Sequence, residues 1–276
     1  MAVRHKSSAE GNWNEVLCWN PNTVPVADDD IVCAGGITQD ITTGEADPLK
    51  FDSFVTTDDC TINVGTSGSP CKIQADKIDI KGRGNVYIVH DHDDGVTDLY
   101  TDHLIVRPAN PEAIFVLTTV DGVADEVTLI EILSGDVSIN LTGTIPHVYV
   151  GRRQSVSPKK VVLEATAGAV ADLEIDYGHV IARNAVTMAR VAAGALLTYT
   201  SGVMTECRVT GNLVYNSPND LATLRARPGS VCDFTKVTSS DGGVITIANL
   251  YIAEGAKVLG LGDTVVATAT HRMEGF

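Results

Sequence analysis

Aromatic side chains are scarce in this sequence: phenylalanine, tryptophan and tyrosine together make up 5% of its 276 residues. Apolar residues still account for 44%, which is enough to build a core and argues against wholesale disorder. Valine, isoleucine, threonine and alanine therefore supply the interior, and these residues suit thin, stacked β layers. A sugar-binding groove needs exposed aromatics, so their scarcity weighs against a carbohydrate-active enzyme or a sugar-binding module, which we keep as an alternative.

Positive charge is also in short supply. The 20 lysines and arginines face 35 aspartates and glutamates, which gives a net charge of −15. A chain with this balance repels nucleic acid, so we expect no nucleic-acid partner. Residues 28–59 are the acidic extreme, with nine acidic residues against the single Lys50. The one basic run, residues 151–160, contains Arg152 and Arg153 and is either a solvated loop or a contact with an acidic neighbour.

Long apolar runs are missing as well. No stretch approaches the roughly 18 apolar residues of a membrane span, so we expect no membrane partner. The opening residues MAVRHKSSAEGNW lack the apolar core of a secretory signal, and we expect synthesis in the cytoplasm. The fingerprints GxSxG, GxGxxG and the Walker loop are absent too. We therefore expect no enzyme and no cofactor.

The six cysteines do not form a metal-binding pattern. They lie at positions 18, 33, 60, 71, 207 and 232, without a CxxC pair or a His–Cys spacing typical of zinc. Small, buried, reduced thiols are the expected state. Cys60 and Cys71 are close enough in sequence to bridge adjacent strands if the protein reaches an oxidising exterior.

A short phrase recurs four times in the C-terminal half. The stretches LEATAGAVADL, ARVAAGALLTY, LRARPGSVCDF and LYIAEGAKVLG align on Gly168, Gly194, Gly229 and Gly255, with spacings of 26, 35 and 26 residues. Apolar residues alternate before each glycine, which fits a strand followed by a corner. A period of this size indicates a solenoid, in which each unit buries its apolar face by stacking on the next. We predict that the four glycines occupy equivalent corners.

Short β-branched runs separated by turn residues continue this pattern from residue 49 onward. We predict an all-β fold, a right-handed parallel β-helix (solenoid) with an N-terminal capping loop; the hand follows from the crossover preference of parallel strands. Residues 31–276 form the β-helix domain, and residues 1–30 form an arm and a capping loop. Residues 186–197 have helix propensity, but the repeat places them in strand–turn–strand. Residues 123–133 could form a short corner helix.

The opening phrase G-N-W-x(5)-W, followed by x-x-V-P-x-A-D-D-D-I-V, resembles the N-terminal entry of many bacterial and phage β-helix proteins. The stretch LKFDSFVTTDDCTINVGTSGSPCKIQADKIDIKGRGNVYI is similar to segments of head-region structural proteins of tailed bacteriophages. The resemblance covers roughly residues 11–90. It implies a virion component on the capsid surface, a decoration (cement) protein that contacts the major capsid protein, or a tail fibre or spike segment. It supplies no catalytic residues.

Partner contacts follow from these expectations. Stacked strands leave lateral faces and two ends to be covered, so we expect a homotrimer. The polar arm of residues 1–12 should be ordered by a partner chain through Arg4 and Lys6. Trp13 and Trp19 should close the first coil, and they are further candidates for partner contact.

One acidic loop is the only candidate metal site. The segment VHDHDDGVTDLYTDHLIV contains Asp91, Asp93 and Asp94 among several histidines and acids, a ligand set that suits a divalent ion. Its glycine is one position early for an EF-hand and the terminal glutamate is missing. A solvated acidic loop without metal is the expected state.

Overall fold

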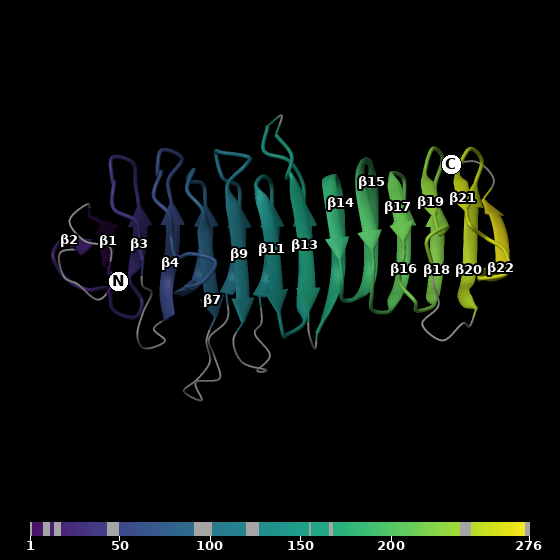
Figure 1. The fold of residues 1–276 in the computed structure, drawn as a ribbon, viewed down its shortest axis with the longest axis horizontal. Coiled ribbons are helices and arrows are strands. Elements are labelled where there is room, and N and C mark those ends of the chain that lie inside the picture. Colours follow the sequence, from purple (N-terminus) through teal and green to yellow (C-terminus); the bar gives the residue numbers. More distant parts are fainter. Residues whose placement is uncertain are drawn as a thin grey trace.

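The chain folds into one long β-stack in the computed structural model, which describes residues 2–7, 12–13, 18–42, 50–90, 101–119, 127–154, 156–165, 168–237 and 244–273. All regular elements in these ranges are strands, and none of the ranges contains a helix long and apolar enough to cross a membrane. β2 and β1 lie at the N-terminal end of the long axis, and from β3 to β22 the strands follow one another along it in sequence order (Figure 1). The all-β prediction is confirmed.

The strands are β1 (Val3–Lys6), β2 (Trp19–Asn20), β3 (Asp30–Cys33), β4 (Lys50–Thr56), β5 (Cys71–Lys72), β6 (Gln74–Ile80), β7 (Val86–His90), β8 (Thr101–Val106), β9 (Ile114–Thr119), β10 (Val127–Ile132), β11 (Asp136–Leu141), β12 (Ile145–Val150), β13 (Lys160–Ala165), β14 (Ala169–Ala182), β15 (Ala185–Tyr199), β16 (Met204–Val209), β17 (Asn212–Tyr215), β18 (Leu221–Ala226), β19 (Val231–Asp233), β20 (Ile245–Ala253), β21 (Lys257–Leu259) and β22 (Val265–Met273).

The strands pair in two interleaved parallel series. The first series runs β1–β3–β4–β6–β8–β10–β12, continues through the N-terminal halves of β14 and β15, and ends with β16–β18–β20–β22. The second runs β5–β7–β9–β11–β13, through the C-terminal halves of β14 and β15, to β17–β19–β21. From β4 to β21, each rung of the stack therefore contributes one strand to each series.

Residues of the first series stack in register into a continuous apolar column. From β3 to β20 the column is Ile31, Phe54, Ile78, Leu104, Ile130, Val148, Leu173, Ala189, Cys207, Leu224 and Leu250, and each of these residues is 0% exposed. Alternate residues of a strand point to opposite faces, so the residues that flank the column lie on the outward face of each strand. The core thus extends without interruption along the stack.

The repeat alignment is correct for three of its four glycines. Gly229 and Gly255, both with positive φ, lie in the turns that lead from β18 to β19 and from β20 to β21. Gly194 lies at the same corner, inside β15. Gly168 is a correction: it precedes β14 and leads from the second series back to the first, at the opposite corner. Strands of both series show the same alternation of apolar and polar residues, and a turn follows each of them. The repeated motif is therefore compatible with either corner.

The two segments with competing helix patterns are strands where they are described. Residues 186–197 lie inside β15, as the repeat predicted. The expected corner helix at 123–133 is wrong for residues 127–132, which form β10 and pair in parallel with β8 and β12; residues 123–126 lie outside the described ranges. Regular pairing on both sides outweighs local helix propensity.

Two tryptophans pack at the N-terminal end. Trp13 and Trp19 are both 0% exposed, and the Trp19 indole Nε1 donates a hydrogen bond to the Trp13 carbonyl at 2.7 Å. Their ring centroids lie 4.6 Å apart, edge to face. Trp13 also packs on Phe51, with 5.5 Å between centroids. These aromatic rings thus cover the N-terminal end of the apolar column.

The N-terminal segment is part of this stack. β1 pairs in parallel with β3 and antiparallel with β2. The Asp29 carboxylate accepts hydrogen bonds from the Ala2 amide at 2.9 Å and from Arg4 Nε at 2.8 Å. The expectation that residues 1–12 depend on a partner chain for their order is therefore wrong for residues 2–7, which take their order from the chain's own sheet.

The C-terminal end is more open. β22 pairs with β20, and the described residues supply no strand for its other edge. Leu259, Leu261 and Val266 are 44%, 40% and 40% exposed there. An open edge of this kind invites pairing with another chain.

Candidate functional site

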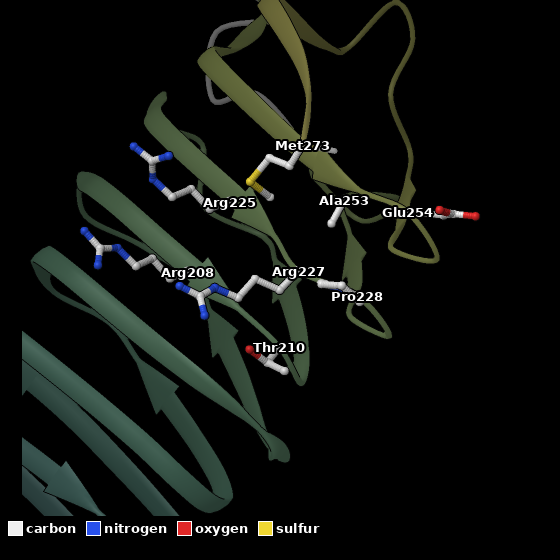
Figure 2. A pocket seen from close by; sticks show the side chains of 8 residues that line it. All are labelled: Arg208, Thr210, Arg225, Arg227, Pro228, Ala253, Glu254 and Met273. Carbon is white, nitrogen blue, oxygen red and sulfur yellow. The ribbon is translucent and has the colours of Figure 1, made fainter. Parts of the chain in front are cut away.

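A groove of about 800 Å³ lies toward the C-terminal end of the stack (Figure 2). Three arginines line it, Arg208 from β16, Arg225 from β18 and Arg227 from the turn that follows. The remaining wall consists of Thr210, Pro228, Ala253, Glu254 and Met273. We call this site the arginine groove.

Strand register builds the groove. Arg190, Arg208, Arg225, Tyr251 and His271 occupy one column on successive strands of the first series. Adjacent strands lie about 4.8 Å apart, so side chains of one column stack directly over one another. Residues separated by 17 to 26 positions in the sequence thereby become neighbours.

Glu206 orients two of the arginines. Its Oε1 accepts a hydrogen bond from Arg208 Nε at 2.8 Å and one from Arg225 Nε at 2.9 Å. The hydrogen bond from Arg208, helped by that from Arg225, lowers the pKa of Glu206 despite its partial burial. Within the described part of the chain, no group accepts a hydrogen bond from the terminal nitrogens of these two guanidinium groups. Their outer edges therefore remain available to an anion.

A stacked cation and two rings continue the column. The Arg225 guanidinium carbon lies 4.3 Å from the centroid of the Tyr251 ring. The Tyr251 ring in turn stacks on His271, with centroids 4.6 Å apart and planes inclined by 20°. The contact of a guanidinium with a ring face contributes roughly 0.5–1 kcal/mol at an accessible site. Both faces of Tyr251 are thereby occupied, so this ring offers no free face to a ligand.

Arg227 is the third cation of the groove. Its side chain is exposed, and no residue in the described ranges accepts a hydrogen bond from it. Figure 2 shows Glu254, the one acidic residue among the described residues of the lining, pointing away from the three arginines. The groove is therefore cationic in a chain whose net charge is −15. The described residues of its lining include three arginines and a single acid, an arrangement that suits anion binding.

The partner-contact candidates Arg4, Lys6, Trp13 and Trp19 lie at the other end of the stack. Arg4 pairs with Asp29 and its side chain is 13% exposed. Lys6 is buried and its Nζ donates to the Ser7 carbonyl. The two tryptophans are buried in the end packing. These side chains are thus engaged within the chain, and none reaches the groove.

The basic candidates Arg152 and Arg153 are also paired internally. The Arg152 guanidinium lies 4.2 Å from the Tyr177 ring centroid. Arg153 donates from Nη1 to the Arg107 carbonyl and from Nη2 to Asp58, both at 2.8 Å. Arg153 therefore pairs with an acid of its own chain, Arg152 packs on a ring, and neither lines the arginine groove.

The metal candidates Asp91, Asp93 and Asp94 lie outside the described residues. Elsewhere in the described ranges, no group of three or more histidine, cysteine or acidic side chains is placed to hold a metal ion. All six cysteines are buried and no disulfide joins any two of them, including Cys60 and Cys71. The prediction that the six thiols are buried is confirmed.

Sequence reasoning missed the arginine groove, although the repeat alignment contained a signal for it. Arg190, Arg225 and Tyr251 each stand four residues before an aligned glycine, and these positions fall in one column of the structure. Arg208 belongs to a rung that the alignment did not include. An alignment of the solvent-facing positions of the repeats, as well as of the core-facing ones, would have placed Arg190, Arg225 and Tyr251 in one column.

Comparisons with known proteins give no further guide to this site. No protein-family model, no curated protein and no solved structure matches the chain.

Proposed function

We propose that this chain is a structural component of a bacteriophage virion, and that it acts as a homotrimeric decoration (cement) protein on the capsid surface. The observation that supports this best is the apolar column from Ile31 to Leu250, which is in register and fully buried from β3 to β20. A continuous, close-packed core makes a stiff rod. Stiffness suits a protein that must bridge neighbouring subunits and resist strain between them.

The detailed fold we propose is a right-handed parallel β-helix. Parallel pairing of every second strand supports a coil that returns to the same series after each rung. The right hand follows from the strong preference of parallel strands for right-handed crossovers. Two tryptophans pack at one end of the rod, whereas the edge of β22 is exposed at the other end. The two ends therefore differ, and the end with the exposed β22 edge is suited to attachment.

The virion setting is supported by the sequence resemblance over residues 11–90. In this setting the rod would contact the major capsid protein and add buried interface between its subunits. A threefold arrangement would cover part of the lateral faces of the stack.

The test starts with the mass of the purified protein in solution. Light scattering should give three times the 29.1 kDa mass of one chain. Electron microscopy of particles made with and without the gene should then show density for this chain on the head. Particles lacking it should lose their genome at a lower temperature. A monomeric protein that is absent from purified particles would refute the proposal.

A tail fibre or spike segment is the second candidate, because the elongated stack in Figure 1 suits a fibre as well as a capsid ornament. Density on the tail would favour this candidate over decoration. The arginine groove gives little support to a sugar-binding module, since the Tyr251 ring beside it has both faces occupied by Arg225 and His271.

A further inference from the structure

We propose that the arginine groove binds an acidic peptide segment of a partner protein, whose carboxylates pair with Arg227 and with the outer edges of Arg208 and Arg225. This inference rests on the groove itself and holds whether or not the chain belongs to a virion. An occupant must carry negative charge and fit a space of about 800 Å³, which is within the roughly 300–1,000 Å³ of a typical ligand pocket.

Charge is the first argument. The chain as a whole repels anions, with 35 acidic against 20 basic residues. Three arginines nevertheless line one groove, and the acidic residue among its described lining residues points away from them. Like charges gathered in this way repel one another unless a counter-charge is present. Glu206 neutralises only part of the cluster, so binding of a further carboxylate is electrostatically favoured.

Preorganisation is the second argument. Glu206 fixes Arg208 and Arg225 through their Nε atoms, and Tyr251 supports Arg225 from the side. A guanidinium group held in this way has already lost much of its rotational freedom, so less entropy is lost when it binds a carboxylate. The two free nitrogens at its outer edge match the two oxygens of a carboxylate.

The wall of the groove indicates the class of ligand. Pro228, Ala253 and Met273 place apolar surface beside the arginines, which suits a peptide carrying both acidic and aliphatic side chains. An acidic polysaccharide would gain from an aromatic platform, and the neighbouring Tyr251 has no free face.

The experiment measures binding of three probes to the full chain by fluorescence anisotropy or calorimetry. The probes are a short fluorescein-labelled peptide of alternating glutamate and valine, an oligogalacturonate, and inorganic phosphate. We expect the peptide to bind most tightly and its affinity to fall as salt is raised. Arg227→Gln should weaken peptide binding about tenfold or more, because it removes a charge-assisted hydrogen bond.

Two further variants complete the design. Thr210→Glu places a carboxylate in the groove and should abolish peptide binding while the melting temperature stays close to that of the unmutated protein. Arg183→Gln removes the same charge at a site paired with Glu164, away from the groove, and should change affinity by less than about twofold. Equal binding by the unmutated protein, R227Q and T210E would overturn the proposal. So would tighter binding of oligogalacturonate or phosphate than of the peptide, or no binding of any probe.

Discussion

Arg107 forms a two-point ion pair with Asp79, with 2.9 Å between Arg107 Nε and Asp79 Oδ1 and 2.7 Å between Nη2 and Oδ2. The Asp79 side chain is only 3% exposed, whereas that of Arg107 is 33% exposed. Burial acts to raise the pKa of Asp79, but the hydrogen bonds and charge of Arg107, together with Lys81, outweigh it and lower the pKa. The pair joins the end of β6 to the residue that follows β8 and so ties neighbouring rungs together.

Asp79→Asn should lower the free energy of unfolding by roughly 2 kcal/mol at neutral pH, because it removes the charged acceptor of two hydrogen bonds. The pKa of Asp79 is depressed in the folded state, so its contribution is present above the unfolded pKa of about 3.9 and is lost as pH falls through the folded value. Urea melts from neutral to acid pH should therefore show a shallower acid decline for the variant. Asp58→Asn, which breaks the exposed pair with Arg153, is the control and should cost less than about 0.5 kcal/mol. Equal losses for the two variants would contradict the assignment.

The buried thiols predict a loss of stability at alkaline pH. Burial raises the pKa of Cys71 and of Cys232 to about 12 in each case. The unfolded thiols titrate near 8.5, so above that pH the folded state binds more protons than the unfolded state and unfolding becomes easier. Each thiol should cost about 2 kcal/mol on going from about pH 8 to about pH 10.

Urea melts at the two pH values measure this loss directly. The double variant Cys71→Ala with Cys232→Ala should show a smaller alkaline decline than the unmutated protein. Thiol labelling near neutral pH should be slow until denaturant is added. Rapid labelling of the folded protein would show that these two thiols are accessible, contrary to their burial.

Close packing at a corner makes Gly211 intolerant of any side chain. A Cβ at this position would lie 2.1 Å from the Ala192 carbonyl oxygen and 2.6 Å from that of Ala195, both on the neighbouring rung. Gly211→Ala should therefore destabilise the protein by about 2 kcal/mol or more, since backbone must move to admit the methyl group. Gly262 has open space around it, and Gly262→Ala should change stability by less than about 0.5 kcal/mol. Thermal melts of the two variants give the comparison, and similar values would argue against the corner geometry.

Inward positions were the part of this fold that could be predicted from the sequence. Leu224 and Leu250 were aligned in the repeat, and the structure places them next to each other in the buried column. Alternation of apolar and polar residues specifies which face of a strand is buried. The buried positions can therefore be predicted without knowing which strand is the partner. The same alternation does not distinguish the two series, and Gly168 was consequently assigned to the wrong corner.

Outward contacts were much harder to predict. Asp79 and Arg107 are 28 residues apart, and Arg208 and Arg225 meet only because β16 and β18 pair in one register. Rungs in this chain differ in length, so a fixed period cannot supply the register. The N-terminal segment was misjudged for a related reason. Val3–Lys6 carries little apolar signal of its own, and its place beside β3 depends on the Asp29 hydrogen bonds and on strand pairing.

The open end of the stack should drive association beyond any lateral oligomer. Leu261 and Val266 are each 40% exposed beside the unpaired edge of β22, and charges at such an edge oppose strand pairing. Leu261→Lys combined with Val266→Lys should therefore shift sedimentation toward smaller species at high protein concentration, with the melting temperature almost unchanged because both side chains are accessible. Val3→Lys with Val26→Lys adds the same charge at the opposite end, where these residues are 48% and 53% exposed, and should leave association as it is in the unmutated protein. If the N-terminal pair disrupts association as strongly as the C-terminal pair, net charge rather than the β22 edge controls it, and the open end is not the attachment surface.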